Sequence, residues 1–237
     1  MKNLKKITVL IGIITLAYSC TKNDDYQEPD EFEFNFDFSK GKDEWLHGFA
    51  DYNSEIDESI YALGFKFSAL PEPLDVNQKS LFITGVNRSD DLFMYIKRKV
   101  SLAPNTTYNI SFDIEFASIY PTNAVGVGGA PGESVYMKAG AVLVEPNKVE
   151  SDGIWRMNLD IGNQGLSGAD MKVIGHVGVA DDTVAYTLVS NNNLAEPFII
   201  TTDTKGEAWV IIGTDSGFES TTALYYNKIS IKIEKQN

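Results

Sequence analysis

The chain has 237 residues, of which 43% are hydrophobic and 11% aromatic, and its formal net charge is −13. A chain of this length and composition can bury one sizeable core. Its acidity argues against partners that are themselves anionic, so a nucleic-acid-binding role is not expected.

The first nineteen residues, "MKNLKKITVLIGIITLAYS", predict an export signal. Lysines at positions 2, 5 and 6 form a positive start, residues 7–17 are apolar, and Ala17 and Ser19 are small residues at the −3 and −1 positions of a cleavage site. The apolar run is shorter than the roughly 20 residues that span a bilayer, so we interpret residues 1–19 as a signal peptide and not as an anchor helix.

Cys20 follows directly and is the single cysteine of the chain, so it has no partner for an internal disulfide. Its position resembles the bacterial lipoprotein signal, in which the cysteine after the cleavage site is lipidated, for example with palmitate, and becomes the new N-terminus. The resemblance implies a lipid anchor in the outer membrane of a Gram-negative bacterium, facing the periplasm or the cell surface. The alternative is ordinary cleavage after Ser19, which leaves Cys20 as a free thiol.

Residues 20–31 are polar and acidic, with too little apolar surface to fold, and predict a tether behind the lipidated cysteine. Fully extended, the tether could reach about 35 Å. Its acidic residues resemble signals that send some lipoproteins to the outer face of the outer membrane. The alternative is a solvated spacer without a sorting role.

From Phe32 onward the hydrophobic pattern has a period of two. Alternating apolar residues occur in "FEFNFDF" (32–38), "TYNISFDIEF" (107–116) and "NKISIKIE" (227–234), and shorter runs of the same kind lie between them. This alternation is typical of half-buried antiparallel strands, and turn-forming residues separate the runs. We therefore expect an all-β fold, a single antiparallel β-sandwich of about a dozen strands over residues 32–237.

The segment "VSLAPNTTYNISFDIEF" (100–116) matches the phrase L-x-P-x-T-x-Y-x-I-x-F. It resembles the jelly-roll sandwiches of the galactose-binding-like and carbohydrate-binding-module type. The segments "FDFSKGKDEW" and "LYYNKISIKI" look like the first and last strands of such a domain. The resemblance implies a jelly-roll fold, whereas function in these proteins lies on loops outside the matching phrase.

A glycine-rich stretch, "GVGGAPGES" (126–134), raises the question of a phosphate-binding or nucleophile loop. It lacks the Gly-Lys-Ser/Thr of a P-loop, it is not followed by a helix as a dinucleotide fingerprint is, and Tyr136 stands where a nucleophile elbow has its last glycine. We expect a bend whose glycines allow positive φ or close backbone approach.

No catalytic residues are predicted. "GTDSGF" (213–218) has a serine beside an aspartate, but His47 and His176 lie in no recognisable partner motif, and one cysteine with two histidines cannot form an ordinary zinc site. With 33 acidic residues, the sequence cannot select a pair of carboxylates for a glycoside hydrolase.

Two charged features stand out. Lys138 lies in the apolar run "SVYMKAGAVLV" and, if buried, needs a carboxylate, for which we consider Asp90, Asp91 or Glu133. The alternative is an edge position with the amine in water. Asn87, Asp90 and Asp91 in "NRSDDL" could hold a structural Ca²⁺, as jelly-roll relatives often do; the alternative is a solvated turn.

The sequence offers loop residues for ligand binding without a signal that selects among them: Tyr52, Tyr120, Asn163, Gln164, Asn191, Asn192 and Asn193. Trp155 and Trp209 are expected in the core, because apolar residues surround them.

The leading hypothesis is a lipid-anchored, non-catalytic module for a glycan or similar ligand. The alternatives are an accessory subunit that docks on an outer-membrane protein and, more weakly, a hydrolase that uses paired carboxylates.

Overall fold

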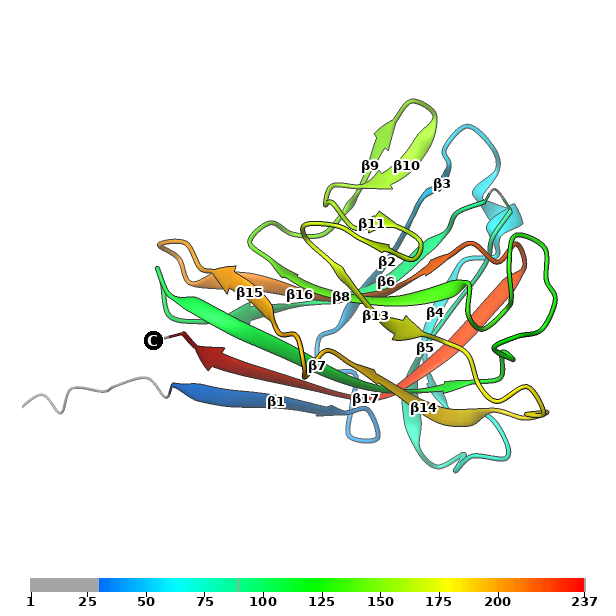
Figure 1. Cartoon of the computed structure of the whole chain (residues 1–237), viewed down its shortest axis with the longest axis horizontal. Coiled ribbons are helices and arrows are strands. Elements are labelled where there is room, and N and C mark those ends of the chain that lie inside the picture. Colours follow the sequence, from blue (N-terminus) through cyan, green and yellow to red (C-terminus); the bar gives the residue numbers. More distant parts are fainter. Residues whose placement is uncertain (1–29, 89, 237) are drawn as a thin grey trace, which may run out of the picture.

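The computed structural model describes residues 30–88 and 90–236, in which almost all regular structure is β-strand and every strand pairing is antiparallel (Figure 1). The predicted signal peptide (1–19), Cys20 and the tether up to residue 29 lie outside the described residues. Within the described part, no helix is long and apolar enough to cross a bilayer. The fold is the antiparallel jelly-roll sandwich that the sequence predicts.

The first large sheet has seven strands and is built around two long central ones, β7 (Thr107–Ser118) and β17 (Thr221–Lys235). Its other strands flank this pair: β1 (Glu31–Asp37), β4 (Gly64–Ala69), β5 (Lys79–Val86), β14 (Thr187–Asn192) and β15 (Phe198–Thr201). Strands β5 and β1 pair with successive halves of β17, while β15 and β14 pair with successive parts of β7. A register shift between Tyr226 and Lys228 inserts Asn227 as a bulge in β17.

The second large sheet has five strands in the order β13-β8-β16-β6-β2. Their bounds are β2 (Leu46–Ala50), β6 (Phe93–Ser101), β8 (Val135–Val142), β13 (Lys172–His176) and β16 (Glu207–Ser216). The two large sheets together contain the dozen strands that the periodicity predicts.

The main core fills the space between the two sheets, because both turn their apolar side chains inward. From β7 it takes Ile110, Phe112, Ile114 and Phe116, all with 0% exposure, and from β17 alternating isoleucines. The period of two in residues 107–116 therefore identifies the core face correctly.

A cover lies over the outer face of the five-stranded sheet, above β16 and β8 in Figure 1. It includes β3 (Tyr52–Asn53), β9 (Lys148–Ser151), β10 (Ile154–Met157), β11 (Gly162–Asn163) and β12 (Leu166–Ser167), and a short 3₁₀ helix (Glu58–Tyr61) lies close by in the chain. Met157, Ile161 and Met171 pack onto outward-facing residues of β6 and β16 in a second, smaller core. The middle of the five-stranded sheet is therefore buried on both faces.

The glycine-rich stretch forms a bend without a following helix. Gly128 (φ +72°) and Gly129 (φ +151°) both have positive φ, as expected. A Cβ atom on Gly128 would lie 2.2 Å from the backbone oxygen of Gly217, so this position excludes side chains by space as well as by conformation.

Gly128→Val should therefore destabilise the domain by on the order of 1–3 kcal/mol, because a β-branched residue is strongly disfavoured at positive φ. Ser134→Ala is the control, since it removes only the hydroxyl of a partly exposed side chain and leaves the glycine backbone unchanged. Thermal melts of both variants test this. Normal melting of Gly128→Val would refute a conformational role for the loop.

Candidate functional site

The outer face of the seven-stranded sheet carries rows of side chains that run across neighbouring strands. One row consists of Leu188, Ala117, Tyr225, Phe82 and Lys66, which are direct partners from β14 to β4. Because partners in antiparallel strands share a face, this row presents mainly apolar and aromatic surface.

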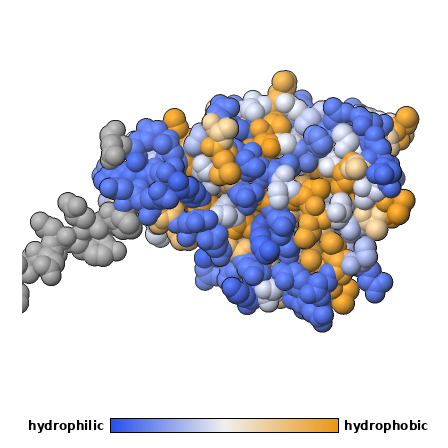
Figure 2. Space-filling view, turned by 60° about the horizontal axis from the view of Figure 1, so that its bottom comes forward, coloured by the Kyte–Doolittle hydropathy of each residue, from blue (hydrophilic) through white to orange (hydrophobic). Residues whose placement is uncertain are grey.

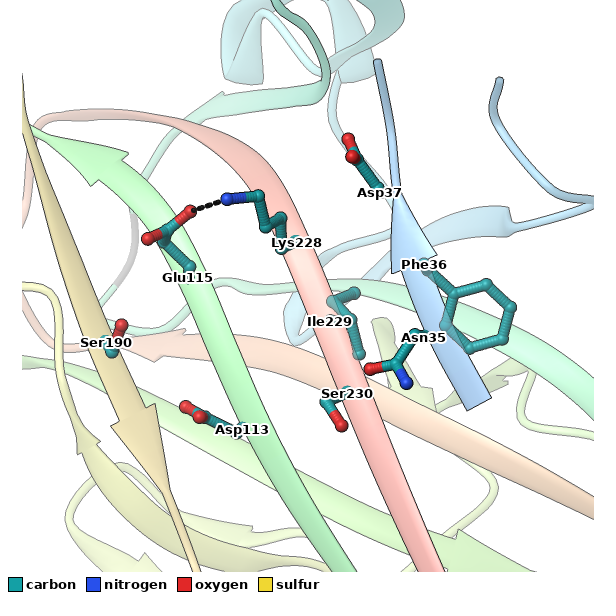
Figure 3. A pocket seen from close by; sticks show the side chains of 9 residues that line it. All are labelled: Asn35, Phe36, Asp37, Asp113, Glu115, Ser190, Lys228, Ile229 and Ser230. Atoms are coloured by element: carbon teal, nitrogen blue, oxygen red, sulfur yellow. Dashed lines mark ion pairs between the residues drawn. The ribbon is translucent and has the colours of Figure 1, made fainter. Parts of the chain in front are cut away.

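The next two rows are polar. Ser190, Glu115, Lys228 and Asp37 form the second row, and Asn192, Asp113, Ser230 and Asn35 form the third. Between them lies a pocket of about 230 Å³, whose polar lining is contributed by β1, β7, β14 and β17 (Figure 3). We call this the sheet-face groove.

The charges of the sheet-face groove are mostly negative. Asp37, Asp113 and Glu115 line it, against one cation, Lys228, whose Nζ lies 3.5 Å from Glu115 Oε1. Hydrogen bonds from Ser39 to Asp37 hold the pKa of that carboxyl below its usual value. The groove is thus rich in hydrogen-bond acceptors, and the lowered pKa of Asp37 keeps that carboxyl ionised at neutral pH.

An aromatic cluster adjoins the groove where the first row meets the second. The Tyr225 ring lies 4.7 Å from that of Phe82 and 5.3 Å from that of Tyr186, centroid to centroid, and all three side chains are partly exposed. Figure 2 brings this side of the molecule forward and shows apolar surface in the middle of the face with hydrophilic residues around it. An aromatic surface beside polar acceptors can hold a ligand that has both an apolar face and hydroxyl groups.

A second pocket, which we call the end pocket, opens where the cover meets one end of the five-stranded sheet. It has a volume of about 300 Å³. Its lining comes from strands β3, β10 and β11 and from the segments before β3 and β6: Asp51, Tyr52, Asn53, Asp91, Ile154, Arg156 and Asn163.

Several residues that the sequence offered as candidates meet at the end pocket. Tyr52 and Asn163 line it, as does Asp91 from the acidic loop. Gln164 lies behind it, where its backbone N–H donates to Asp215 Oδ2 at 2.8 Å and its side chain donates to the backbone oxygen of Asp90. Asp90 itself is exposed.

Lys138 is fully buried, but its carboxylate partner is Asp215 and not Asp90, Asp91 or Glu133 as the sequence suggested. Lys138 Nζ donates to Asp215 Oδ2 at 2.7 Å and to the backbone oxygen of Ile161 at 2.8 Å. The two side chains come from adjacent strands β8 and β16, and their exposures are 0% and 1%. Glu133 is exposed to solvent. The cover closes over this pair, because Ile161 belongs to the cover.

Two carboxyl groups of the end pocket have raised pKa values. Burial, together with the charge of Asp215 and a hydrogen bond shared with it, raises the pKa of Asp91 to about 9. Burial together with the same charge raises the pKa of Asp51 to about 6. Asp51, Asp90 and Gln164 also have left-handed backbone conformations, with φ of +59°, +65° and +47°.

The remaining candidates lie elsewhere. Tyr120 accepts a hydrogen bond from the backbone N–H of Ala223 and is half-buried. Asn191 donates to the backbone oxygen of His176, and Asn193 holds the backbone of β7 through Phe112 and Ile110. Asn192, the third candidate asparagine, is the register partner of Asp113 and lies beside the groove.

Trp155 and Trp209 are half-buried instead of lying fully in the core, and a lysine ammonium lies over each ring. Asn87 is buried and donates to the backbone oxygen of Ser216. Among the described residues, no three His, Cys, Asp or Glu side chains are grouped so as to hold a metal ion. The calcium site at Asn87, Asp90 and Asp91 stays a prediction.

Sequence reasoning missed the sheet-face groove. Asn35, Asp37, Asp113 and Glu115 all stand at the polar positions of strands that the periodicity identified. Their proximity depends on which strands are neighbours, and β1, β7, β14 and β17 are far apart in sequence. The sequence signal that could have identified the groove is the set of polar residues that alternate with apolar residues along each of these strands.

No known protein family and no curated protein matches this chain. Among solved structures, it is similar to a carbohydrate-binding module from the β-sandwich superfamily studied for promiscuous specificity, with 11% identity and a TM-score of 0.36. That similarity covers 81% of this chain and 58% of the other, so the chain spans less than two thirds of that structure.

Two further modules are similar over most of their length. TmCBM61, solved with β-1,4-galactotriose, has 10% identity and a TM-score of 0.38, over 82% of this chain and 92% of that one. TmCBM27, which recognises mannan, has 12% identity and a TM-score of 0.35, over 87% and 99%. Because these TM-scores are low, the assignment of the fold rests on the strand order and register described above.

Lys138→Met should lower the free energy of unfolding by about 3–5 kcal/mol, because it leaves the buried Asp215 charge without its ammonium. Lys138→Met/Asp215→Asn should recover part of that loss, since it removes the uncompensated charge. Chemical denaturation measures both.

Lys172→Met is the control, because the Lys172–Glu196 pair is exposed and its loss should have little effect. If Lys138→Met were as mild as Lys172→Met, the buried pair would not have the role assigned to it.

Proposed function

We propose that the chain is a non-catalytic β-sandwich module that binds a neutral glycan along the sheet-face groove. The observation that carries the proposal is the aromatic cluster around Tyr225 directly beside a groove lined by Asp37, Asp113 and Glu115. A sugar ring has an apolar face that packs on an aromatic ring and hydroxyl groups that donate to carboxylates.

The charge of the groove supports a neutral ligand over an acidic one. Three carboxylates and one lysine would repel a uronic acid or a sulfated sugar, and the net charge of −13 adds to the repulsion at long range. Neutral hydroxyl groups meet no such barrier.

The lining of the groove spans four neighbouring strands, which supports a chain-like ligand. It lies on a strand surface shared by β1, β7, β14 and β17, and the aromatic cluster continues it toward β5. A polysaccharide could lie across these rows with successive units over the polar and aromatic parts.

Binding can be tested by affinity electrophoresis of the purified protein in gels that contain a β-glucan, a mannan or a galactan, with polygalacturonate as the acidic comparison. At least one neutral polysaccharide should retard the protein, and Tyr225→Ala should weaken that binding about tenfold, as removal of a central aromatic contact does. Polygalacturonate should not bind.

Phe67→Ala is the matched control, because Phe67 is 43% exposed and is the register partner of the buried Leu81, on the other face of the sheet. Full binding by a normally folded Tyr225→Ala variant would contradict the proposal that the glycan binds along the sheet-face groove. Absence of any glycan binding, together with co-purification of an outer-membrane protein, would instead favour the accessory-subunit hypothesis.

For the N-terminal part, we propose that Cys20 is lipidated after removal of residues 1–19 and that the module is anchored to the outer membrane of a Gram-negative bacterium. The signal pattern and the single cysteine at its end support this. The first strand of the described residues, β1, starts at Glu31, at the end of the proposed tether.

Mass spectrometry of the membrane fraction should show a diacylated or triacylated N-terminal peptide that starts at Cys20. An unmodified Cys20 peptide in the soluble fraction would contradict the anchor and leave the glycan proposal unaffected.

A further inference from the structure

The end pocket contains more carboxyl groups than cations. Asp51, Asp91 and Asp215 lie together, with Lys138 as the buried ammonium and Arg156 as a loosely held guanidinium. The Asp215 charge is matched by Lys138 at 2.7 Å, whereas the Arg156 guanidinium lies 3.9 Å from Asp51 Oδ1 and is 53% exposed. Asp91, the third carboxyl group, therefore has no ion pair among the described residues.

We propose that the end pocket binds an amino sugar with a free amine and that the ligand's ammonium group lies between Asp51 and Asp91, where it supplies the cation that Asp91 lacks. The site is separate from the sheet-face groove, so the two proposals stand or fall independently.

The acceptor that would receive the ammonium is already in place. The Asp51 side chain lines the pocket and is only 10% exposed, yet it receives no hydrogen bond from any described residue. A buried carboxylate without a donor is costly, so an incoming N–H donor would gain a charge-assisted hydrogen bond there.

The second acceptor is occupied by a proton. Asp91 Oδ1 and Asp215 Oδ1 are both buried and receive no hydrogen bond from an N–H donor. Burial and the adjacent Asp215 raise the pKa of Asp91 to about 9, which favours its protonated form at neutral pH. A ligand ammonium beside Asp91 would stabilise the ionised carboxylate, so we expect binding to release this proton.

The rest of the pocket fits a single sugar ring. Asn53, Asn163 and Arg156 supply amide and guanidinium groups for hydroxyls, and Tyr52 and Ile154 supply apolar surface. The volume of about 300 Å³ is at the lower end for small-molecule sites, which favours one monosaccharide unit over a chain.

The proposal fixes the direction of the pH dependence. Asp51, with a pKa of about 6, must be ionised to accept the ammonium, and Asp91 releases its proton more easily as the pH approaches 9. The charged groups that shift these two pKa values are Asp215, Lys138 and Arg156, and the charge of Asp51 also raises the pKa of Asp91. Affinity should therefore rise from about pH 5 to about pH 7, as long as the ligand amine remains protonated.

The test is calorimetric titration of the protein with glucosamine, N-acetylglucosamine and glucose at about pH 7, in two buffers of different ionisation enthalpy. Glucosamine should bind at least about tenfold more tightly than the other two sugars, because they lack the charge. The comparison of buffers should show release of a proton on binding.

Asp51→Asn should weaken glucosamine binding by about tenfold or more. Asp91→Asn keeps a donor to Asp215, so it should fold normally and abolish the proton release. Asp113→Asn, in the sheet-face groove, is the control and should bind glucosamine like the unmodified protein.

Three results would overturn the proposal: no glucosamine binding by folded protein, equal affinity for glucosamine and glucose, or glucosamine binding that survives in Asp51→Asn. Titration with CaCl₂ alone provides a further check, since Ca²⁺ binding that Asp51→Asn abolishes would make the pocket a metal site.

Discussion

The alternation of side chains along β7 and β17 is the constraint on which the rest of the molecule depends. These two strands are the longest among the described residues and pair over most of their length. Their inward residues are fully buried aromatic and branched aliphatic side chains. Because successive side chains of a strand point to opposite faces, the residues between them must lie on the outer face of the sheet. Because the cover lies on the other sheet, the described residues leave this outward face open, and its polar and aromatic rows are available to a ligand.

The five-stranded sheet shows what happens when an outer face is covered. Lys138, Asp215 and Lys97 project outward from β8, β16 and β6, and the cover surrounds them with backbone and side-chain oxygens, such as those of Ile161 and Pro146. Burial of such charges is tolerated because each has a direct partner. At the rim of the cover this compensation is incomplete, and burial raises the pKa values of Asp51 and Asp91.

The sequence predicts what depends on local order. The strand at residues 107–116, its core face and the positive φ of Gly128 and Gly129 all follow from spacing or residue type. It does not predict what depends on register between distant strands. Asp215 lies 77 residues from Lys138 and faces it because β8 and β16 pair, while Asp91, much nearer in sequence, reaches Asp215 instead. Tyr225, Phe82 and Glu115 become neighbours in the same way, so no local motif marks the groove.

The central claim is that the outer face of the seven-stranded sheet is the glycan-binding face. The most direct measurement is the mapping of backbone amide chemical shifts of the protein during titration with a neutral oligosaccharide. We expect the changes to cluster on β7, β14 and β17 around Glu115, Ser190, Tyr225 and Lys228, with the covered five-stranded sheet unaffected. Changes confined to the cover or to the end pocket, with none on these strands, would contradict the account.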